Sequence, residues 1–411
     1  MPRHQYLGDD LLKLEIAAPQ GFTFALGDTI VGRLVRKTPI DTPEAVVQLS
    51  LMGRTKVKIV YRTAQSRTVL RDNWALLSHQ SVIFKGPLNL AEHDSPLTWP
   101  VNVTIPFAPD PSCRQSHISR CSLLPLDRDH PGHHILPGSF SFNDESVLLY
   151  PRATCFVEYY LHAKMVSAHG DRLQTQEALH PIQIRQPIAD SSHFYVPRML
   201  QETGSITSQR LLPGMENADL SFKQHMQKVF SSSKVPSFKY GVRLTVPTAI
   251  QIHDRTPILL QLEVVPIADG TSQNLQYTAV NVNIMNVQMI LRSRTLCIAP
   301  GNLLGGEHSN SSETKSNLNL DRLFTGADPP VTLAAGGSHE SIHIGNTYQL
   351  TLDPRGLKSG NQRLETVPQI WPDFETYNIR HTHSMMWRIY LSIAGEKKEH
   401  QFTTPIYIIS I

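Results

Sequence analysis

A run of basic residues without an acidic neighbour is the first feature of this sequence that could do chemistry. From Ala45 to Arg71 the chain has no aspartate or glutamate. Lysine and arginine bind phosphate and carboxylate groups through charge-assisted hydrogen bonds, so we expect the run to bind a phosphorylated peptide or anionic lipid headgroups. The alternative is an ordinary solvated sheet face. The candidate binding residues are Arg54, Lys56, Lys58, Arg62, Arg67 and Arg71.

Cysteine and histidine side chains gather in the segment 107–135. Cys113, His117 and Cys121 are each separated by three residues, and His130 follows. Zinc binds thiolate and imidazole ligands tetrahedrally, so four side chains of this segment could hold it. The spacing lacks the Cys-x2-Cys knuckle of common zinc fingers, which favours incidental residues in a surface loop. We therefore predict no metal or other cofactor, with these four residues as the candidates if a metal is bound.

Sequence signatures of catalysis are absent from the chain. It contains no Gly-x-Ser-x-Gly elbow, no Gly-rich phosphate loop and no His-Glu-x-x-His motif. Ser139 lies close to the histidine-rich segment, but a nucleophile also needs a base and an orienting group, and neither is evident. We predict a protein that binds rather than catalyses. A metal-dependent hydrolase built on 107–135 is the alternative from another class.

Segments with alternating apolar residues must position these side chains. Apolar residues recur at every second position from Cys155 to Met165, which is typical of a half-buried strand. Lys56 and Lys58 alternate with apolar neighbours, so their side of the strand should lie in water. Strand patterns separated by turn residues, with one short helical pattern, predict an all-β fold of antiparallel sandwiches.

The stretch from Phe22 to Val35 predicts a hairpin near the start of the chain. Gly27 and Asp28 supply the turn, because glycine tolerates positive φ and aspartate can hydrogen-bond to nearby backbone. Gly32 lies within the second strand, where we expect the strand to pass close to another part of the molecule.

Changes in composition divide the chain. Strand patterns fill residues 1–187 and 235–411, whereas residues 188–234 are polar and contain a helical pattern at Asp219–Phe230. We expect two domains joined by a linker, 188–234, with a short helix. Residues 301–341 are rich in Gly, Ser, Asn and Asp and lack periodicity, which predicts a disordered insertion in the second domain.

Charge and hydropathy exclude further classes. The net charge of +3, from 38 Lys and Arg against 35 Asp and Glu, argues against a nucleic-acid-binding protein. No run approaches the roughly 18 apolar residues of a membrane span, and the N-terminus lacks the apolar core of a signal peptide. The four cysteines are widely spaced, which fits reduced thiols. These features predict a cytoplasmic protein.

Five short motifs follow one another along the chain: Gly27–Val35, Val47–Gly53, Trp99–Pro106, Leu136–Phe140 and Ala153–Met165. Their sequences and their order make this chain resemble the arrestin-like family over almost its whole length. In the second half, Phe374–Arg380 and Thr404–Ile409 are similar to the end of fungal arrestin-like proteins.

The resemblance implies two tandem immunoglobulin-like antiparallel β-sandwich domains and a non-enzymatic adaptor or scaffold in trafficking, endocytosis or signalling. Its partners would be cytoplasmic tails of membrane transporters or receptors, so it would also be found at the plasma or endosomal membrane. The loop 62–73 would take the place of a receptor-facing loop. Recruitment of ubiquitin-ligase machinery stays open, because the chain has no Pro-Pro-x-Tyr motif. A constitutive coat subunit of the same fold, like those of retromer, is the alternative.

Overall fold

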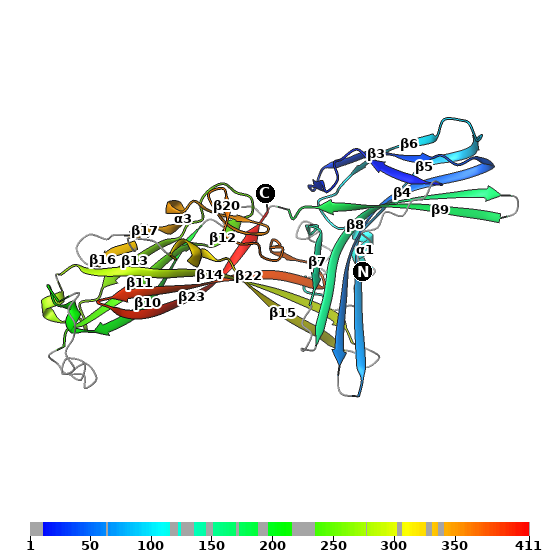
Figure 1. Ribbon diagram of the computed structural model, residues 1–411. Helices are drawn as coiled ribbons and strands as arrows, with labels where there is room; N and C mark the ends of the chain where they lie inside the picture. The colour runs from blue at the N-terminus through cyan, green and yellow to red at the C-terminus, as the bar shows by residue number, and fades with distance from the viewer. Residues whose placement is uncertain are drawn as a thin grey trace. The chain divides into compact units, whose positions relative to one another are not determined.

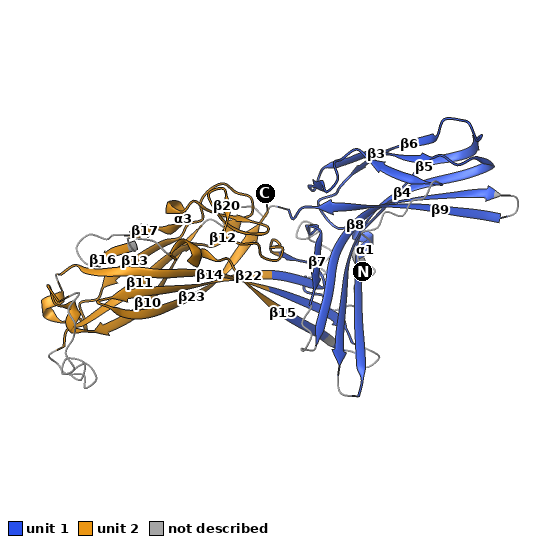
Figure 2. Cartoon of the chain, in the orientation of Figure 1, with its two compact units in different colours: residues 1–187, 294–312, 374–381 blue, residues 188–293, 313–373, 382–411 orange. Residues whose placement is uncertain are grey.

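The computed structural model describes twelve stretches of the chain, and these divide into two compact units (Figures 1 and 2). Unit 1 comprises residues 1–187, 294–312 and 374–381, and unit 2 comprises residues 188–293, 313–373 and 382–411. The described residues are 11–62, 65–115, 122–124, 135–144, 151–169, 172–187, 196–215, 235–276, 278–301, 306–325, 331–335 and 341–410.

The described part of the chain is all-β, as the alternating patterns predict. Its two α-helices are single turns, and none of its helices is long and apolar enough to cross a membrane. The helices are α1 (Pro111–Gln115) and α3 (Ile344–Thr347), with 3-10 turns η3 (Gln209–Leu211), η4 (Gln273–Leu275) and η5 (Leu320–Leu323).

Two sheets form the N-terminal part of unit 1 (Figure 1). One has the order β1-β3-β6, and the other has the order β2-β9-β8-β4-β5 with β7 also paired to β8. Long antiparallel strands β4, β5 and β8 build most of the second sheet. The strands are β1 (Lys13–Ile16), β2 (Thr23–Phe24), β3 (Thr29–Arg36), β4 (Ile40–Arg62), β5 (Arg67–Leu90), β6 (Leu97–Thr104), β7 (Phe140–Asn143), β8 (Arg152–His169) and β9 (Arg172–Ile184).

The expected hairpin at 22–35 is wrong, although its turn is confirmed. β2 pairs in parallel with β9, whereas β3 pairs with β1 and β6, so the two strands enter different sheets. Gly27 has φ 84°, and the Asp28 carboxylate accepts a hydrogen bond from the Ala25 backbone N–H at 2.7 Å. The close approach expected at Gly32 is also present, because a Cβ there would lie 2.3 Å from the Glu15 carbonyl oxygen.

Two segments from the C-terminal half complete the core of unit 1. Both are distant in sequence from residues 1–187, and Figure 2 colours all three segments alike. The fully buried ring of Trp74 on β5 stacks on Tyr377, with centroids 4.6 Å apart and planes 9° from parallel. Phe374 packs edge-on against Phe140 of β7 at 4.8 Å. The first 187 residues therefore do not contain the whole of their own core.

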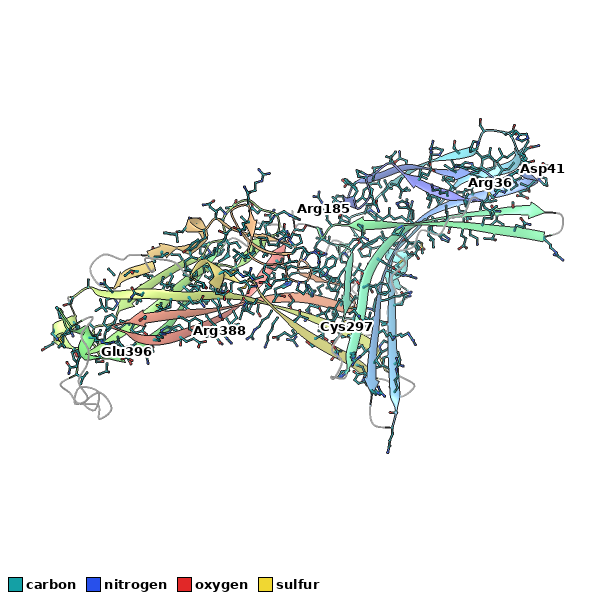
Figure 3. All side chains as sticks on the ribbon, viewed as in Figure 1. Arg36, Asp41, Arg185, Cys297, Arg388 and Glu396 are labelled. Carbon is teal, nitrogen blue, oxygen red and sulfur yellow. The ribbon has the colours of Figure 1, made fainter. Side chains whose placement is uncertain are left out.

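A pair of buried cysteines lies in the same core. Cys297 is near the end of β14 (Figure 3), and its thiol neighbours that of Cys155 on β8. Both are free thiols, as the widely spaced cysteines predict. Burial raises the pKa of the Cys155 thiol well above its ordinary value, so it is held in the protonated, unreactive form.

Unit 2 has its own hydrophobic core, built around Trp387, Tyr240 and Phe238. The remaining sheets have the orders β10-β11-β13-β17, β18-β19-β20 and β12-β23-β22-β14-β15, the last with β16 on β14 and with β21, a strand of unit 1, on β22. The remaining strands are β10 (Pro197–Thr207), β11 (Ser237–Pro247), β12 (Ala249–Gln251), β13 (Gln261–Pro266), β14 (Val280–Pro300), β15 (Glu307–Asn317), β16 (Val331–Ala335), β17 (Ser341–His343), β18 (Leu350–Asp353), β19 (Gly356–Ser359), β20 (Gln362–Arg363), β21 (Phe374–Glu375), β22 (Ile379–Ile393) and β23 (Glu396–Ile409).

Two stretches that were expected to contain no strands do contain them. β10 lies in the expected linker 188–234 and pairs along its whole length with β11. β15 and β16 lie in the expected disordered insertion 301–341, and β16 pairs with the first part of β14. These strands are polar or short and are stabilised mainly by backbone pairing, so their sequences lack the apolar alternation that marks a strand. The helix expected at Asp219–Phe230 falls outside the described residues.

We predict that His400 lowers the stability of the folded protein in acid. His400 is buried between Glu202 and Tyr240, with Lys398 nearby on β23. Burial lowers the pKa of His400 below its ordinary value of 6.5, and Glu202 only partly opposes this effect. The unfolded chain therefore binds the proton more readily, so this stabilisation is present above pH 6.5 and is lost as pH falls below it.

Urea unfolding of the full chain at pH 7.5 and pH 5.5 checks this. His400→Gln should show a smaller loss of stability between the two pH values than the wild type. The exposed His93→Gln variant, in the turn between β5 and β6, is the matched control and should keep the wild-type loss. An equal loss in all three proteins would contradict the assignment to His400.

Candidate functional site

A pocket of about 530 Å³ in unit 1 brings together part of the basic run. It is formed by β4, β5 and β8 with the last residue of β14. Three of the six sequence candidates contribute to its wall. The lining residues are Lys56, Val57, Lys58, Arg71, Asp72, Asn73, Thr154, Phe156 and Pro300.

Strand register places the basic side chains together. Lys58 lies directly opposite Arg71 on β5 and Thr154 on β8. Side chains of directly opposed residues share a face of the sheet with Cβ atoms about 4.5–5.5 Å apart. Like charges at that separation repel each other, so an anion held between Lys58 and Arg71 would remove an unfavourable interaction as well as add two favourable ones.

Lys56 lies one step along the same face. It is opposite Asn73 on β5 and Phe156 on β8, and its ammonium lies 5.9 Å from the centre of the Phe156 ring. The ring is largely buried, so it supplies a rigid apolar wall beside the cations. The pocket therefore combines positive charge with one aromatic surface, which suits a ligand with an anionic group and an apolar part.

Arg54 has a different role from the one expected of it. Its guanidinium forms an ion pair and a hydrogen bond with Glu158 of β8, the residue directly opposite in the register. It also lies over the Tyr160 ring, 5.5 Å from the centre. The basic run therefore does have a counter-charge, supplied by a strand about a hundred residues later. Arg54 serves the sheet and does not line the pocket.

We predict that Arg54→Gln destabilises the protein by about 2 kcal/mol, because it leaves the buried Glu158 carboxylate without its cation. Lys56→Gln is the neighbouring control on the same face, and it should cost less than about 1 kcal/mol. Chemical denaturation of the two variants measures the difference. Equal costs would contradict the separate roles given to Arg54 and Lys56.

Arg62 and Arg67 also fall outside the pocket. They lie opposite each other in the strand register at the end of the β4–β5 hairpin, and both side chains are exposed. Within the described residues the structure therefore separates the six candidates into a pocket group of Lys56, Lys58 and Arg71, one structural arginine, and an exposed pair at the hairpin end.

The opposite face of the same strands carries a buried polar network that sequence reasoning missed. The Thr55 hydroxyl donates to the Asn378 side-chain oxygen at 2.7 Å, and the Asn378 amide donates to Asp72 at 2.9 Å. The Trp74 indole N–H donates to the same Asp72 oxygen at 2.6 Å. The network fixes β4 and β5 to the segment 374–381, and so holds the pocket strands in place. Asp72 at an inward-facing position of an alternating strand is the signal that could have revealed it.

The zinc candidates receive no support from the described residues. Cys113 lies within α1, is buried and is a free thiol whose pKa is raised, first by burial and then by Asp110. His117, Cys121 and His130 lie outside the described residues. Among those that are described, no group of three or more His, Cys, Asp or Glu side chains could hold a metal ion.

The sequence matches no model of a protein family, and no curated protein matches it.

Proposed function

We propose that this chain is an arrestin-like adaptor, built of two tandem immunoglobulin-like β-sandwiches, which binds cytoplasmic regions of membrane proteins without catalysis. The pocket formed by Lys56, Lys58 and Arg71 is the observation that carries the proposal. The all-β architecture and the five ordered sequence motifs support it. The protein would act in the cytoplasm and associate with membranes through its partners.

The occupant of the pocket would be a phosphorylated peptide. Lys58 and Arg71 would hold the phosphate from opposite strands, and a neighbouring apolar side chain of the peptide would pack on Phe156. Arginine binds phosphate oxygens in a bidentate manner, whereas lysine acts as a point charge with three donors. The two strands would thus contribute complementary kinds of contact.

Charge reversal with a matched control tests the proposal. Lys58→Glu/Arg71→Glu reverses the cross-strand pair inside the pocket, and Arg62→Glu/Arg67→Glu reverses an equal charge in a cross-strand pair of the same two strands outside it. Fluorescence anisotropy should show saturable binding of a phosphopeptide to wild type. The first variant should bind at least about tenfold more weakly, which corresponds to roughly 1.4 kcal/mol. The second should bind nearly as well as wild type.

Three results would count against the proposal. They are equal weakening in both variants, undiminished binding in the pocket variant, or equal affinity for the unphosphorylated peptide. A parallel measurement with phosphatidylserine vesicles separates a lipid surface from a peptide, since loss of vesicle binding alone would assign the pocket to lipid. Added salt should weaken the binding of either the phosphopeptide or the vesicles, because it screens charges that are exposed to solvent.

A further inference from the structure

A second pocket, of about 520 Å³, lies in unit 2 and has no part in the proposed adaptor function. It is formed by the turn after β12, by strands β18 and β19, and by the turn that follows β19. Its walls are polar, with Leu352 as the one large apolar residue among those that line it. The lining residues are His253, Asp254, Arg255, Gln349, Thr351, Leu352, Asp353, Lys358, Gly360 and Asn361.

The backbone around this pocket is held in an unusual conformation. His253 has φ 67° and Gln349 has φ 47°, and these are two of the four non-glycine residues with positive φ in the described part of the chain. Hydrogen bonds fix both, from the His253 N–H to the Leu352 carbonyl and from the Gly360 N–H to the Gln349 carbonyl, each at 3.0 Å. Strained residues that the surrounding structure holds in place gather at ligand-binding sites.

A buried carboxylate positions one cation of the pocket. Asp353 accepts hydrogen bonds from Lys358 and Arg363, both at 2.8 Å, and from the Arg355 backbone N–H at 3.0 Å. Burial by itself would raise the pKa of Asp353, but these hydrogen bonds lower it overall, so the carboxylate stays ionised. Lys358 therefore has a fixed place with two further N–H donors to offer.

Arg255 supplies a second cation. It is exposed, and no hydrogen-bond or ion-pair partner is recorded for its side chain among the described residues. Among the lining residues, the two positive charges of Arg255 and Lys358 balance the two negative charges of Asp254 and Asp353. Arg363 does not line the pocket, but its ion pair with Asp353 adds one positive charge beside it, which leaves the Arg255 charge for a ligand. A guanidinium recognises carboxylate and phosphate groups through its planar fork of donors.

Uncharged polar groups line the rest of the pocket. Thr351 and Asn361 offer a hydroxyl and an amide, and the Gln349 side-chain oxygen is available because its amide nitrogen already donates to the Asn346 carbonyl at 2.7 Å. No phenylalanine, tyrosine or tryptophan side chain is among the lining residues, and His253 supplies the one ring. This set matches a compact ligand with several hydroxyl groups better than an apolar one.

We propose that this pocket binds a small polyhydroxylated anion, with its acidic group on Arg255 and Lys358 and its hydroxyls on Gln349, Thr351 and Asn361. A sugar acid and a sugar phosphate share this chemistry. The adaptor function could fail without affecting this site, because the two pockets have no residue in common.

Calorimetric titration of the full chain tests the proposal with four probes: gluconate, glucose 6-phosphate, glucose and acetate. Gluconate or glucose 6-phosphate should bind saturably, and the difference between them tells whether a carboxylate or a phosphate is preferred. Glucose, which lacks the charge, and acetate, which lacks the hydroxyls, should bind at least about tenfold more weakly. Arg255→Gln should weaken binding of the preferred anion by at least about tenfold.

Lys397→Gln is the matched control. Lys397 is exposed and lies in unit 2 outside this pocket. The substitution removes one positive charge, as Arg255→Gln does, but should leave binding unchanged. The proposal is overturned if neither anion binds at about 10 mM, if Arg255→Gln binds as well as wild type, or if both variants weaken binding equally. Equal affinity for glucose or acetate would overturn it as well.

Discussion

A fragment of residues 1–187 is expected not to fold as a stable domain, although it contains every strand of the two N-terminal sheets. The core of unit 1 also needs the segments 294–312 and 374–381, which the fragment lacks. Their buried apolar side chains include Cys297, Ile298, Tyr377 and Ile379. At about 1.5–3 kcal/mol for each large buried side chain, their loss is comparable to the roughly 5–15 kcal/mol that stabilises a whole domain.

Tryptophan fluorescence and urea unfolding measure this effect directly. The fragment contains only Trp74 and Trp99, and Trp74 loses its stacking partner Tyr377. We expect red-shifted emission and no cooperative transition. Co-expression with residues 188–411 supplies the missing segments and should restore blue-shifted emission and cooperative unfolding. Blue-shifted emission and cooperative unfolding of the 1–187 fragment alone would contradict the idea that unit 1 depends on its distant segments.

Asn378→Ala is expected to destabilise the protein by about 3 kcal/mol. The substitution removes the acceptor of the Thr55 hydroxyl and a donor to Asp72, both at buried positions. A buried polar group that loses its partner costs about 1–3 kcal/mol. The exposed Asn102 of β6 makes no side-chain hydrogen bond to any described residue, so Asn102→Ala is the control and should cost less than about 0.5 kcal/mol.

A double-mutant cycle with Thr55→Val separates the network from simple loss of packing. Valine has nearly the shape of threonine but has no hydroxyl that could be left without a hydrogen-bond partner. The double variant Asn378→Ala/Thr55→Val should therefore lose less stability than the two single variants added together. The expected difference is about 1 kcal/mol. Strict additivity would mean that the Thr55–Asn378 hydrogen bond does not contribute to stability.

Local patterns were enough to predict the all-β fold and the strand that carries the basic residues. The alternation from Cys155 to Met165 lies wholly within β8, and Lys56 and Lys58 do share one face of β4. This works because the side-chain period of a strand is a property of a few neighbouring residues. The polar strands β10 and β15 carry no such period, so the sequence gives no sign of them.

Long-range pairing could not be predicted in the same way. The ion pair between Arg54 and Glu158 and the hydrogen bond between Thr55 and Asn378 join residues far apart in the sequence. The parallel pairing of β2 with β9 is equally remote, whereas the local sequence, two strands with a turn between them, predicts a hairpin. The six basic residues have different roles because of these contacts, and a single sequence does not reveal which distant residues are in contact.

Because unit 1 is composed of three separate segments, it cannot complete its fold until the last of them has been synthesised. A ribosome that has just completed residue 187 must still add residues up to 381 before the last segment of unit 1 exists. At about 5–20 residues per second, this takes roughly 10–40 s. During that interval Trp74 and Asp72 have no Tyr377 and no Asn378 to cover them. The nascent protein therefore presents unfinished β-sheet to the cell, which makes it a natural client for chaperones that act at the ribosome exit.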